Sequence, residues 1–253
     1  MNKLRYAAPV EPRVAIITGG ARGIGAATAL RLAEAGRDIV IADMLDVEAS
    51  QTICDVQALG RRAMYLKVDV SNEQAVTDMA NQTMAAFGRL DILVCCAGIF
   101  GVETPYLKIT SDTFARFLAI NVMGVHFAHQ AAIPHMLAQG WGRCVTITSG
   151  ARLGATHNVP YGVSKGAVWS LVMALGNAYP SQGVFVNGVE PGRALTEMVV
   201  PRFTPEHLAN PGIPIGRYSD ANEVSEVIEF LTSERNTYTT GAVWSVKGAS
   251  GWS

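Results

Sequence analysis

The chain has 253 residues, of which 49% are hydrophobic and 16% are charged, and its formal net charge is −1. This composition suits one compact α/β domain with a large buried core, and the charge excludes an overall basic field for nucleic acid or an anionic membrane surface. The four cysteines form no C-x-x-C pair and no histidine cluster has metal-ligand spacing, so we expect a reduced, cytoplasmic protein without a metal site. Residues 1–13 contain no continuous apolar run, which indicates a polar lead-in and neither a signal peptide nor a membrane anchor.

The first predicted element is a β-branched strand at 14–17, followed by a glycine-rich turn and a helical pattern that continues to Gly36. The glycines of the turn have the spacing G-x-x-x-G-x-G and not the G-x-G-x-x-G of the general dinucleotide fingerprint. A turn at the start of a helix offers unpaired N–H groups and the positive end of the helix dipole to an anion. We therefore expect the turn to bind a dinucleotide pyrophosphate, although a plain tight turn is the alternative. The candidate residues are Gly19, Arg22, Gly23, Ile24 and Gly25.

The second predicted strand, 39–42, ends at Asp43, about 20 residues beyond the glycine turn. A carboxylate at this place would bind the two adenosine ribose hydroxyls of NAD and would repel the 2′-phosphate of NADP. Arg22 argues the other way, because a basic residue in the glycine turn can bind that phosphate. We expect NAD, since Asp43 lies at the strand end, and keep NADP as the alternative.

Strand and helix patterns then alternate to the C-terminus. Further strands are expected at 63–68, 91–96, 144–148, 184–187 and 242–246, and helices at 46–59, 72–87, around 110–138, from 161, and at 221–233. Seven strands that are nearly all apolar predict a single-domain Rossmann fold, a doubly wound parallel sheet with helices on both faces. No linker interrupts the pattern, so residues 1–253 are expected to form one dinucleotide-binding catalytic domain.

The carboxyl ends of the predicted strands carry the polar and glycine motifs of the chain. Ligands of doubly wound sheets bind at this edge. The residues that fall at or just past a strand end include Asp69, Gly98, Ser149, and Pro191 with Gly192. The candidate chemistry is therefore expected on one rim of the sheet.

Tyr161 and Lys165 are four residues apart and lie on one face of the helix that carries them. A free tyrosine has a pKa of about 10 and is a poor acid or base near neutrality. A nearby ammonium favours the phenolate, so we expect Lys165 to lower the pKa of Tyr161 towards the range of general acid–base catalysis. An ordinary packed tyrosine beside a solvated lysine is the alternative.

At this point the chain resembles a classical short-chain dehydrogenase/reductase over about residues 14–250. The motifs that carry the resemblance stand in the family's order: Thr18–Gly25, Asp69-Val70, Cys96-Ala97-Gly98, Asn121, Ser149, Tyr161-x-x-x-Lys165, and Pro191-Gly192 with Thr196. The resemblance implies a catalytic tetrad of Asn121, Ser149, Tyr161 and Lys165. It implies cofactor contacts from Gly19, Arg22, Gly23, Ile24, Gly25, Asp43, Asp69, Val70, Cys96, Ala97, Gly98, Tyr161, Lys165, Pro191, Gly192 and Thr196.

The resemblance also implies a mechanism. Ser149 would hold the substrate oxygen by a hydrogen bond, Tyr161 would exchange the proton, and the nicotinamide would exchange the hydride. Lys165 would stabilise the phenolate and bind the nicotinamide ribose, while Asn121 would hold a water that links Lys165 to solvent. A strand-end cap for Ser149 and a helix kink for Asn121 are the purely structural alternatives.

Three departures from the family pattern stand out. The usual Asn-Asn-Ala-Gly reads Cys95-Cys96-Ala97-Gly98, which removes side-chain amide contacts and leaves the backbone contacts. Ser149 lies 12 residues before Tyr161, one fewer than in many members. The usual C-terminal Asp-Gly-Gly reads Lys247-Gly248-Ala249, with no effect that we can predict from the sequence.

The substrate side of the site is less specific. Candidate substrate residues are Ser149, Arg152, His157, Glu190 and Arg193, although solvated loop residues or a structural ion pair are equally compatible. The proline-rich stretch at about 194–213 predicts a mobile lid. Its modest length favours a small or medium polyol, sugar, hydroxy acid or cyclic alcohol.

We therefore predict an NAD-dependent oxidoreductase that interconverts a secondary alcohol, or a sugar or polyol hydroxyl, with its carbonyl. The alternatives are an NADPH-dependent ketone reductase of the 3-oxoacyl type and a non-catalytic dinucleotide-binding scaffold. The expected partners are a small-molecule alcohol or carbonyl substrate and further copies of the chain, in a homotetramer or homodimer, with neither nucleic acid nor membrane.

Overall fold

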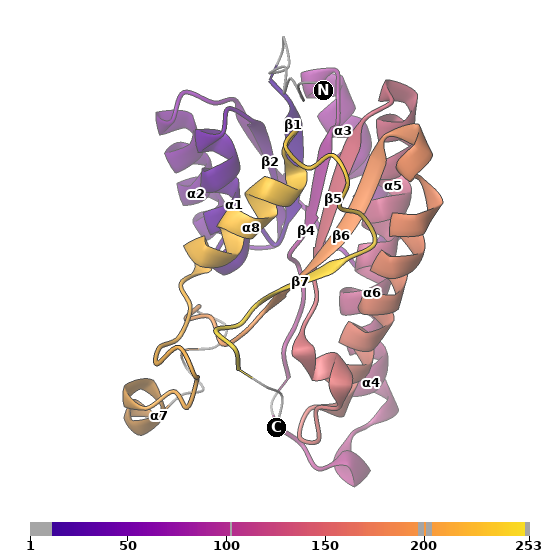
Figure 1. The fold of residues 1–253 in the computed structure, drawn as a ribbon. Coiled ribbons are helices and arrows are strands. Elements are labelled where there is room, and N and C mark those ends of the chain that lie inside the picture. Colours follow the sequence, from indigo (N-terminus) through magenta and orange to yellow (C-terminus); the bar gives the residue numbers. More distant parts are fainter. Residues whose placement is uncertain (1–11, 102, 197–199, 201–203, 251–253) are drawn as a thin grey trace.

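Seven parallel strands form one sheet within the described part of the chain, which comprises residues 12–101, 103–196, 200 and 204–250 of this computed structural model (Figure 1). The spatial order is β3-β2-β1-β4-β5-β6-β7. The strands are β1 (Val14–Thr18), β2 (Asp38–Asp43), β3 (Ala63–Lys67), β4 (Ile92–Cys95), β5 (Gly142–Ile147), β6 (Val184–Pro191) and β7 (Val243–Val246). The predicted doubly wound Rossmann sheet is confirmed.

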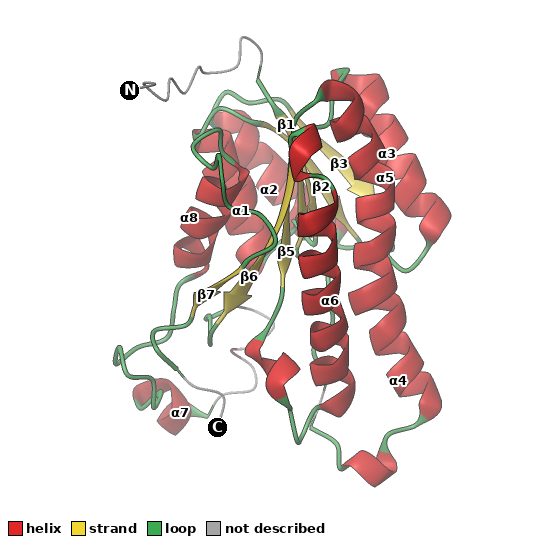
Figure 2. Cartoon of the chain, turned by 45° about the vertical axis from the view of Figure 1, so that its right-hand side comes forward, coloured by secondary structure: helices red, strands yellow, loops and turns green. Residues whose placement is uncertain are grey.

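Helices cover both faces of the sheet (Figures 1 and 2). One face packs against α1 (Gly23–Glu34), α2 (Asp46–Ala58) and α8 (Ala221–Thr232). The other face packs against α3 (Glu73–Phe87), α5 (Gly124–Gln139) and α6 (Val159–Ala178). The short helices α4 (Ser111–Leu118) and α7 (Pro205–Ala209) extend beyond the carboxyl edge of the sheet (Figure 2).

The continuous apolar runs follow from this two-sided covering. In β1, Ile16 joins the core on the α5 side, whereas Ala15 and Ile17 join the core on the α1 side, and all three are fully buried. Successive side chains of a strand point to opposite faces, so both alternating sets must be apolar when both faces are covered.

Two elements differ from the expected pattern. The long helical region is interrupted by a π-helical segment, η2 (Ala119–Met123), between α4 and α5. Strand β6 extends to Pro191 because Glu190 and Pro191 pair with Ser245 and Val246 of β7. The polar end of β6 therefore belongs to the sheet and not to the loop after it.

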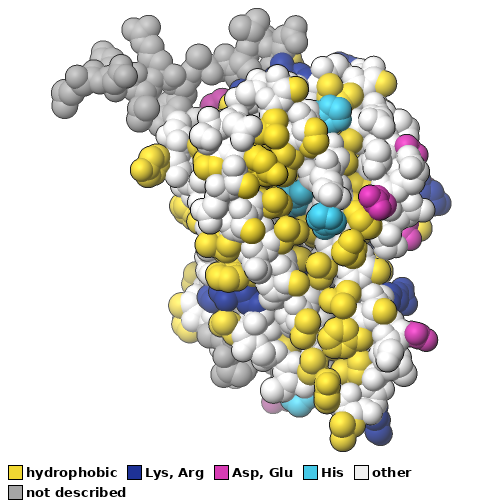
Figure 3. Space-filling model, turned by 90° about the vertical axis from the view of Figure 1, so that its right-hand side faces the viewer, with side chains coloured by type: hydrophobic (Ala, Val, Ile, Leu, Met, Phe, Trp, Pro, Cys, Tyr) yellow, Lys and Arg dark blue, Asp and Glu magenta, His cyan; other side chains and the backbone are white. Residues whose placement is uncertain are grey.

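The outer surface is uneven in its polarity. On the face that carries α5 and α6, hydrophobic side chains form a band (Figure 3). The exposed large hydrophobic side chains in α6 and in the segments around α4 and α5 include Tyr106, Leu107, Met123 and Val163. No helix in the described ranges is long and apolar enough to cross a membrane. The predicted lid, about 194–213, lies partly outside the described residues, as does most of the predicted lead-in, 1–13.

Candidate active site

The glycine turn after β1 packs directly against the turn after β4. Gly19 has a φ of 66°, and a Cβ atom placed on it would lie 2.6 Å from the backbone nitrogen of Ala97. A Cβ atom on Gly25 would lie 2.0 Å from the carbonyl oxygen of Gly19. Only glycine fits this close backbone approach, which leaves the start of α1 open for a pyrophosphate group.

Asp43, at the end of β2, is attached to the same turn. Its Oδ2 atom accepts a hydrogen bond from the Ala21 N–H at 3.0 Å, and Oδ1 accepts from the N–H groups of Met44 and Leu45 at 2.7 and 3.2 Å. A carboxylate has about four acceptor positions, so it keeps capacity for a ribose hydroxyl. Arg22 is exposed at the N-cap of α1. The backbone role of Asp43 was not expected from the sequence.

The next motif along the chain, Asp69-Val70, follows strand β3. Asp69 is exposed, and its Oδ1 atom accepts hydrogen bonds from the N–H and hydroxyl groups of Ser71. Val70 is buried against Gly124 at the start of α5, where a Cβ atom would come within 2.8 Å of the valine methyl. Val70 therefore fixes the end of β3 against the segment that carries Asn121.

The turn after β4 is held by its backbone. The N–H of Cys96 donates to the carbonyl of Thr18 at 3.0 Å, and the N–H of Ala97 donates to the Thr18 hydroxyl at 3.4 Å. These bonds use backbone atoms and the Thr18 hydroxyl, so they do not depend on the side chains of Cys95 and Cys96. Burial raises the pKa of Cys95 to about 12 and raises the pKa of Cys96 still further, so both thiols stay protonated at neutral pH.

Asn121 lies in the π-helical segment η2 and links this segment to the loop after β4 and to α6. Its amide oxygen accepts from the N–H of Ile99 at 2.8 Å, and its amide nitrogen donates to the Ile99 carbonyl at 3.0 Å and to the Ser164 hydroxyl at 3.1 Å. The side chain is almost fully buried. Both ends of the amide are thus engaged, and Asn121 fixes the loop after β4 to α6.

Ser149, Tyr161 and Lys165 converge where β5 meets the start of α6. The Ser149 hydroxyl accepts from the N–H of Ala151 at 3.2 Å and is hydrogen-bonded to Tyr161. The Lys165 ammonium donates to the carbonyl of Ile147 at 2.7 Å and lies 5.7 Å from the centre of the Tyr161 ring. The Phe100 ring meets the Tyr161 ring edge-on, with centroids 4.7 Å apart.

The pKa shifts differ from the expectation for this pair. Burial raises the pKa of Tyr161, and the hydrogen bond with Ser149 offsets this only in part. Burial also lowers the pKa of Lys165 to about 8. The expected lowering of the Tyr161 pKa by Lys165 is therefore not found, because burial of the phenolate dominates and Lys165 is not among the groups that shift this pKa.

The candidate substrate residues separate into two groups. Arg152 and Glu190 form an ion pair with Nε and Oε2 3.1 Å apart, and Lys247 binds the other carboxylate oxygen at 2.9 Å. The structural ion pair considered for these residues is therefore what the structure contains. Lys247, noted only as a departure from the family pattern, was missed as its third member.

The remaining candidates lie at the surface. The His157 ring is exposed, and its backbone carbonyl accepts from the N–H of Thr104 at 3.1 Å. Arg193 is exposed and donates to the carbonyl of Pro211 at 3.2 Å.

The cofactor-binding candidates after β6 are held by backbone bonds. The Gly192 N–H donates to the Val246 carbonyl at 2.8 Å, and the carbonyl of the half-buried Thr196 accepts from the Val200 N–H at 2.9 Å.

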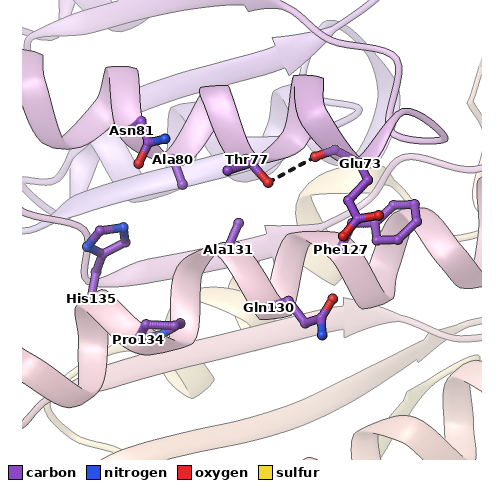
Figure 4. Close-up of a pocket in the computed structure, with 9 residues that line it drawn as sticks. All are labelled: Glu73, Thr77, Ala80, Asn81, Phe127, Gln130, Ala131, Pro134 and His135. Atoms are coloured by element: carbon purple, nitrogen blue, oxygen red, sulfur yellow. Dashed lines mark hydrogen bonds between the residues drawn. The ribbon is translucent and has the colours of Figure 1, made fainter.

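A small cavity of about 180 Å³ lies between the loop after β4, α4 and the start of α6. Its walls are Gly101, Thr104, Ile109, Thr113, Phe117, His157, Asn158 and Pro160. A second cavity of about 220 Å³ lies between α3 and α5 (Figure 4), and none of the site residues named above lines it. Of these two cavities, only the first has wall residues that are adjacent in sequence to Phe100 and Tyr161, namely Gly101 and Pro160.

Comparison with known proteins gives the family. Residues 19–249 match a family model described as enoyl-(acyl carrier protein) reductase. The chain is 35% identical to cis-4-hydroxycyclohexanecarboxylate dehydrogenase of Sinomonas cyclohexanicum, over 93% of this chain and 95% of the relative. It is 30% identical to 2-dehydro-3-deoxy-L-rhamnonate dehydrogenase (NAD(+)) of Sphingomonas sp. (strain SKA58), over 96% and 97% of the two chains.

A solved structure gives the same result. The crystal structure of NAD+-bound xylitol dehydrogenase is similar to this chain with a TM-score of 0.90 and 30% identity, over 96% of this chain and 100% of the other. The chain therefore belongs to the short-chain dehydrogenase/reductase family of oxidoreductases.

Proposed function

We propose that the protein is an NAD-dependent dehydrogenase that interconverts a secondary alcohol, or a sugar or polyol hydroxyl, with its carbonyl. The observation that supports this most is the convergence of Ser149, Tyr161 and Lys165 at the carboxyl edge of the sheet. The glycine turn and Asp43 lie on the same edge, where a dinucleotide fits. Relatives named for NAD and for polyol, sugar-acid and cyclic alcohol substrates favour the same reading.

NAD fits the cradle that Gly19 and Gly25 form, and Asp43 would hold its adenosine ribose. When bound, NAD supplies the hydride acceptor. Asp69, Val70, the Cys96 to Gly98 turn, and the segment from Pro191 to Thr196 would complete the binding edge. The whole chain would then act as one catalytic domain.

The protein's own groups hold the substrate oxygen and move its proton. The Ser149 hydroxyl accepts from the Ala151 N–H and is hydrogen-bonded to Tyr161, so on substrate binding its O–H would turn from Tyr161 to the substrate oxygen. Tyr161 takes the alcohol proton at its phenolic oxygen, which requires the phenolate, the form that burial disfavours and that a rise in pH would supply. Asn121 fixes the loop after β4 against α6, which keeps that wall of the site in place.

The substrate we favour is a small or medium hydroxylated molecule, such as a polyol, sugar, hydroxy acid or cyclic alcohol. A cavity of about 180 Å³, whose walls include Gly101 and Pro160 next in sequence to Phe100 and Tyr161, has a volume that suits a ligand of this size. Ser149 would contact it directly. His157 lines this cavity and would contact the substrate, and Arg193 stays a candidate contact, whereas Arg152 and Glu190 are occupied by each other.

Two alternatives have observations in their favour. Arg22 is exposed at the N-cap of α1, where it would bind a 2′-phosphate, so an NADPH-dependent ketone reductase is the second candidate. The backbone bonds to both oxygens of Asp43 would suit a purely structural aspartate. A non-catalytic scaffold is the third reading.

The test is an absorbance screen for NADH and NADPH, in which NAD and NADP are offered with secondary alcohols, polyols, aldoses and hydroxy acids. We expect one substrate class to reduce NAD, and Tyr161→Phe to lower turnover by roughly 10²- to 10⁴-fold. Tyr238→Phe is the matched control, because it removes a phenol that is 96% exposed. Preferred use of NADPH would favour the second candidate, and full activity of Tyr161→Phe would exclude the proposed proton transfer.

The direction of the reaction should depend on pH. Burial raises the pKa of Tyr161, so the neutral phenol, the acid needed for carbonyl reduction, is the favoured form. Alcohol oxidation needs the phenolate, and its rate should rise with pH. Initial rates in both directions over a pH series check this, and an oxidation rate that ignores pH would contradict it.

Assembly and location complete the proposal. We propose a homodimer or homotetramer that buries the hydrophobic band beside α5 and α6, because such a band on a monomer typically marks an interaction site (Figure 3). Light scattering on the parent and on Val163→Lys measures this, and an unchanged mass would contradict it. All four cysteines are free, which favours the cytoplasm.

A further inference from the structure

The side chain of Glu190 is a buried charge at the carboxyl end of β6. It has no exposed surface, and its oxygens accept hydrogen bonds from Arg152 Nε at 3.1 Å, Lys247 Nζ at 2.9 Å and the Ser245 hydroxyl at 3.3 Å. A buried carboxylate is costly unless it is paired and fully hydrogen-bonded. This one has two cations and a hydroxyl around it.

The two cations come from segments that border the proposed active site. Arg152 lies in the short helix η3 (Gly150–Leu153), whose N-cap is Ser149. The Arg152 N–H donates to the Ser149 carbonyl at 3.2 Å, and the N–H of Ala151 donates to the Ser149 hydroxyl. The orientation of the Ser149 hydroxyl therefore depends on how η3 is held.

Lys247 links Glu190 to the other side of the site. A Cβ atom on Gly192 would lie 2.8 Å from the Lys247 Cα, so the Pro191-Gly192 turn packs directly on the lysine backbone. The next residue, Gly248, packs against Ile215, whose N–H donates to the Gly248 carbonyl at 3.3 Å. Lys247 thus joins the end of β6 to the segment that follows the predicted lid.

The charges make Glu190 hard to replace. Burial acts to raise its pKa, but Lys247 and Arg152 outweigh burial and hold the pKa below its usual range, so the carboxylate is ionised at neutral pH. With Glu190 neutral, Arg152 and Lys247 would face each other without a counter-charge. The side chains of Arg152 and Lys247 would then turn towards solvent, and the segments that carry them would shift.

We propose that Glu190 is a positioning residue for the reaction, which acts through Arg152 to orient the Ser149 hydroxyl and through Lys247 to hold the Pro191-Gly192 turn and the segment around Ile215. The inference rests on the proposed function for its kinetic part only. It also gives the Lys247 departure a reason, since the lysine supplies the second cation of the pair.

The kinetic test compares Glu190→Gln with the parent on the substrate found in the screen. We expect kcat to fall by about 10- to 100-fold, because a small displacement of the reacting groups has an effect of this size. The dissociation constant of NADH, measured by fluorescence, should rise by a smaller factor than kcat falls, because the glycine turn and Asp43 are untouched and only the Pro191-Gly192 side of the binding edge is loosened. Glu226→Gln is the matched control, since its carboxylate pairs with Arg31 at an exposed site.

A kcat of Glu190→Gln equal to that of the parent would overturn the inference. If Glu190→Gln does not fold, Lys247→Met is the second variant, because it keeps the Arg152 to Glu190 pair. We expect this variant to lose about threefold to tenfold in kcat. An Arg152→Lys variant should recover part of the activity lost in Arg152→Met, because it keeps the charge but not the guanidinium geometry. If Arg152→Lys recovers none of the lost activity, the result argues against a charge-based role.

Hydrogen exchange tests the inference independently of any activity. We expect Glu190→Gln to exchange faster than the parent at Gly154, in the turn after η3, and at Ile215 and Gly216, while α1 stays unchanged. Unchanged exchange at both segments would overturn the inference even if no substrate is found. If the parent is inactive but Glu190→Gln shows the expected exchange pattern, the proposed function is wrong, whereas the contacts of Glu190 still hold the two segments.

Discussion

At the scale of single residues, burial changes the pKa of Lys165 from the value that its motif alone would suggest. Its pKa is lowered to about 8 from an ordinary value near 10.5, because its ammonium is removed from water. Between these two pH values the unfolded chain binds more protons than the folded one, so the free energy of unfolding should rise with pH. Lys165→Met should lack this rise, which urea unfolding at several pH values in the window measures. The same slope in both proteins would contradict the assignment.

Asp43 is the residue on which the choice of cofactor should depend. Asp43→Asn keeps an acceptor for the Ala21 N–H but removes the charge that repels a 2′-phosphate. We expect kcat/KM for NAD to fall by about tenfold and kcat/KM for NADP to rise, corresponding to about 1.4 kcal/mol of transition-state stabilisation lost with NAD. Steady-state kinetics with both cofactors measures this, and an unchanged ratio would show that Asp43 serves only the backbone.

At the scale of elements, the turn between β1 and α1 depends on two constraints at Gly19, its positive φ and its contact with Ala97. Gly60 provides a matched control, because its φ is 76° and nothing lies within 4 Å of a Cβ atom there. We expect Gly60→Ala to cost about 1–2 kcal/mol of stability and to bind NADH normally. Gly19→Ala should cost more and should lose NADH binding. Urea unfolding and NADH fluorescence measure the two effects, and normal binding by Gly19→Ala would refute the proposed cradle.

At the scale of the whole molecule, the proposed active site and a buried network of ion pairs lie on opposite edges of the sheet. At the amino edge, Asp91 is fully buried before β4 and binds Arg13 and Arg89 at 3.0 and 2.7 Å, while Arg13 also binds Glu234 beyond α8. We expect Asp91→Ala to cost about 3 kcal/mol, because it leaves both arginines without their buried partner. Its KM values should stay unchanged.

The control for this edge is Asp46→Ala, whose carboxylate pairs with Lys67 at a site where both side chains are more than half exposed. It should destabilise the protein far less than Asp91→Ala does, since solvent screens an exposed pair. Equal losses in the two variants, measured by denaturant unfolding, would argue against a special role for the amino edge.

The sequence by itself determined the sheet, the layers and the order of the motifs. A run such as Ile92–Cys95, apolar at every position, requires a strand covered on both faces, and an acid or glycine at its end marks the functional edge. Tyr161 and Lys165 were also predictable, because four residues along one helix fix their relation. These features depend on local periodicity, which each segment carries in its own residues.

Only the tertiary structure decided which distant charges meet and how deeply they are buried. Arg152, Glu190 and Lys247 come together because β6 and β7 are neighbours and η3 folds over their ends. The raised pKa of Tyr161 and the lowered pKa of Lys165 have the same origin, since burial is a property of the packed whole. Desolvation and long-range pairing depend on what surrounds a residue in space, and no local pattern records that environment.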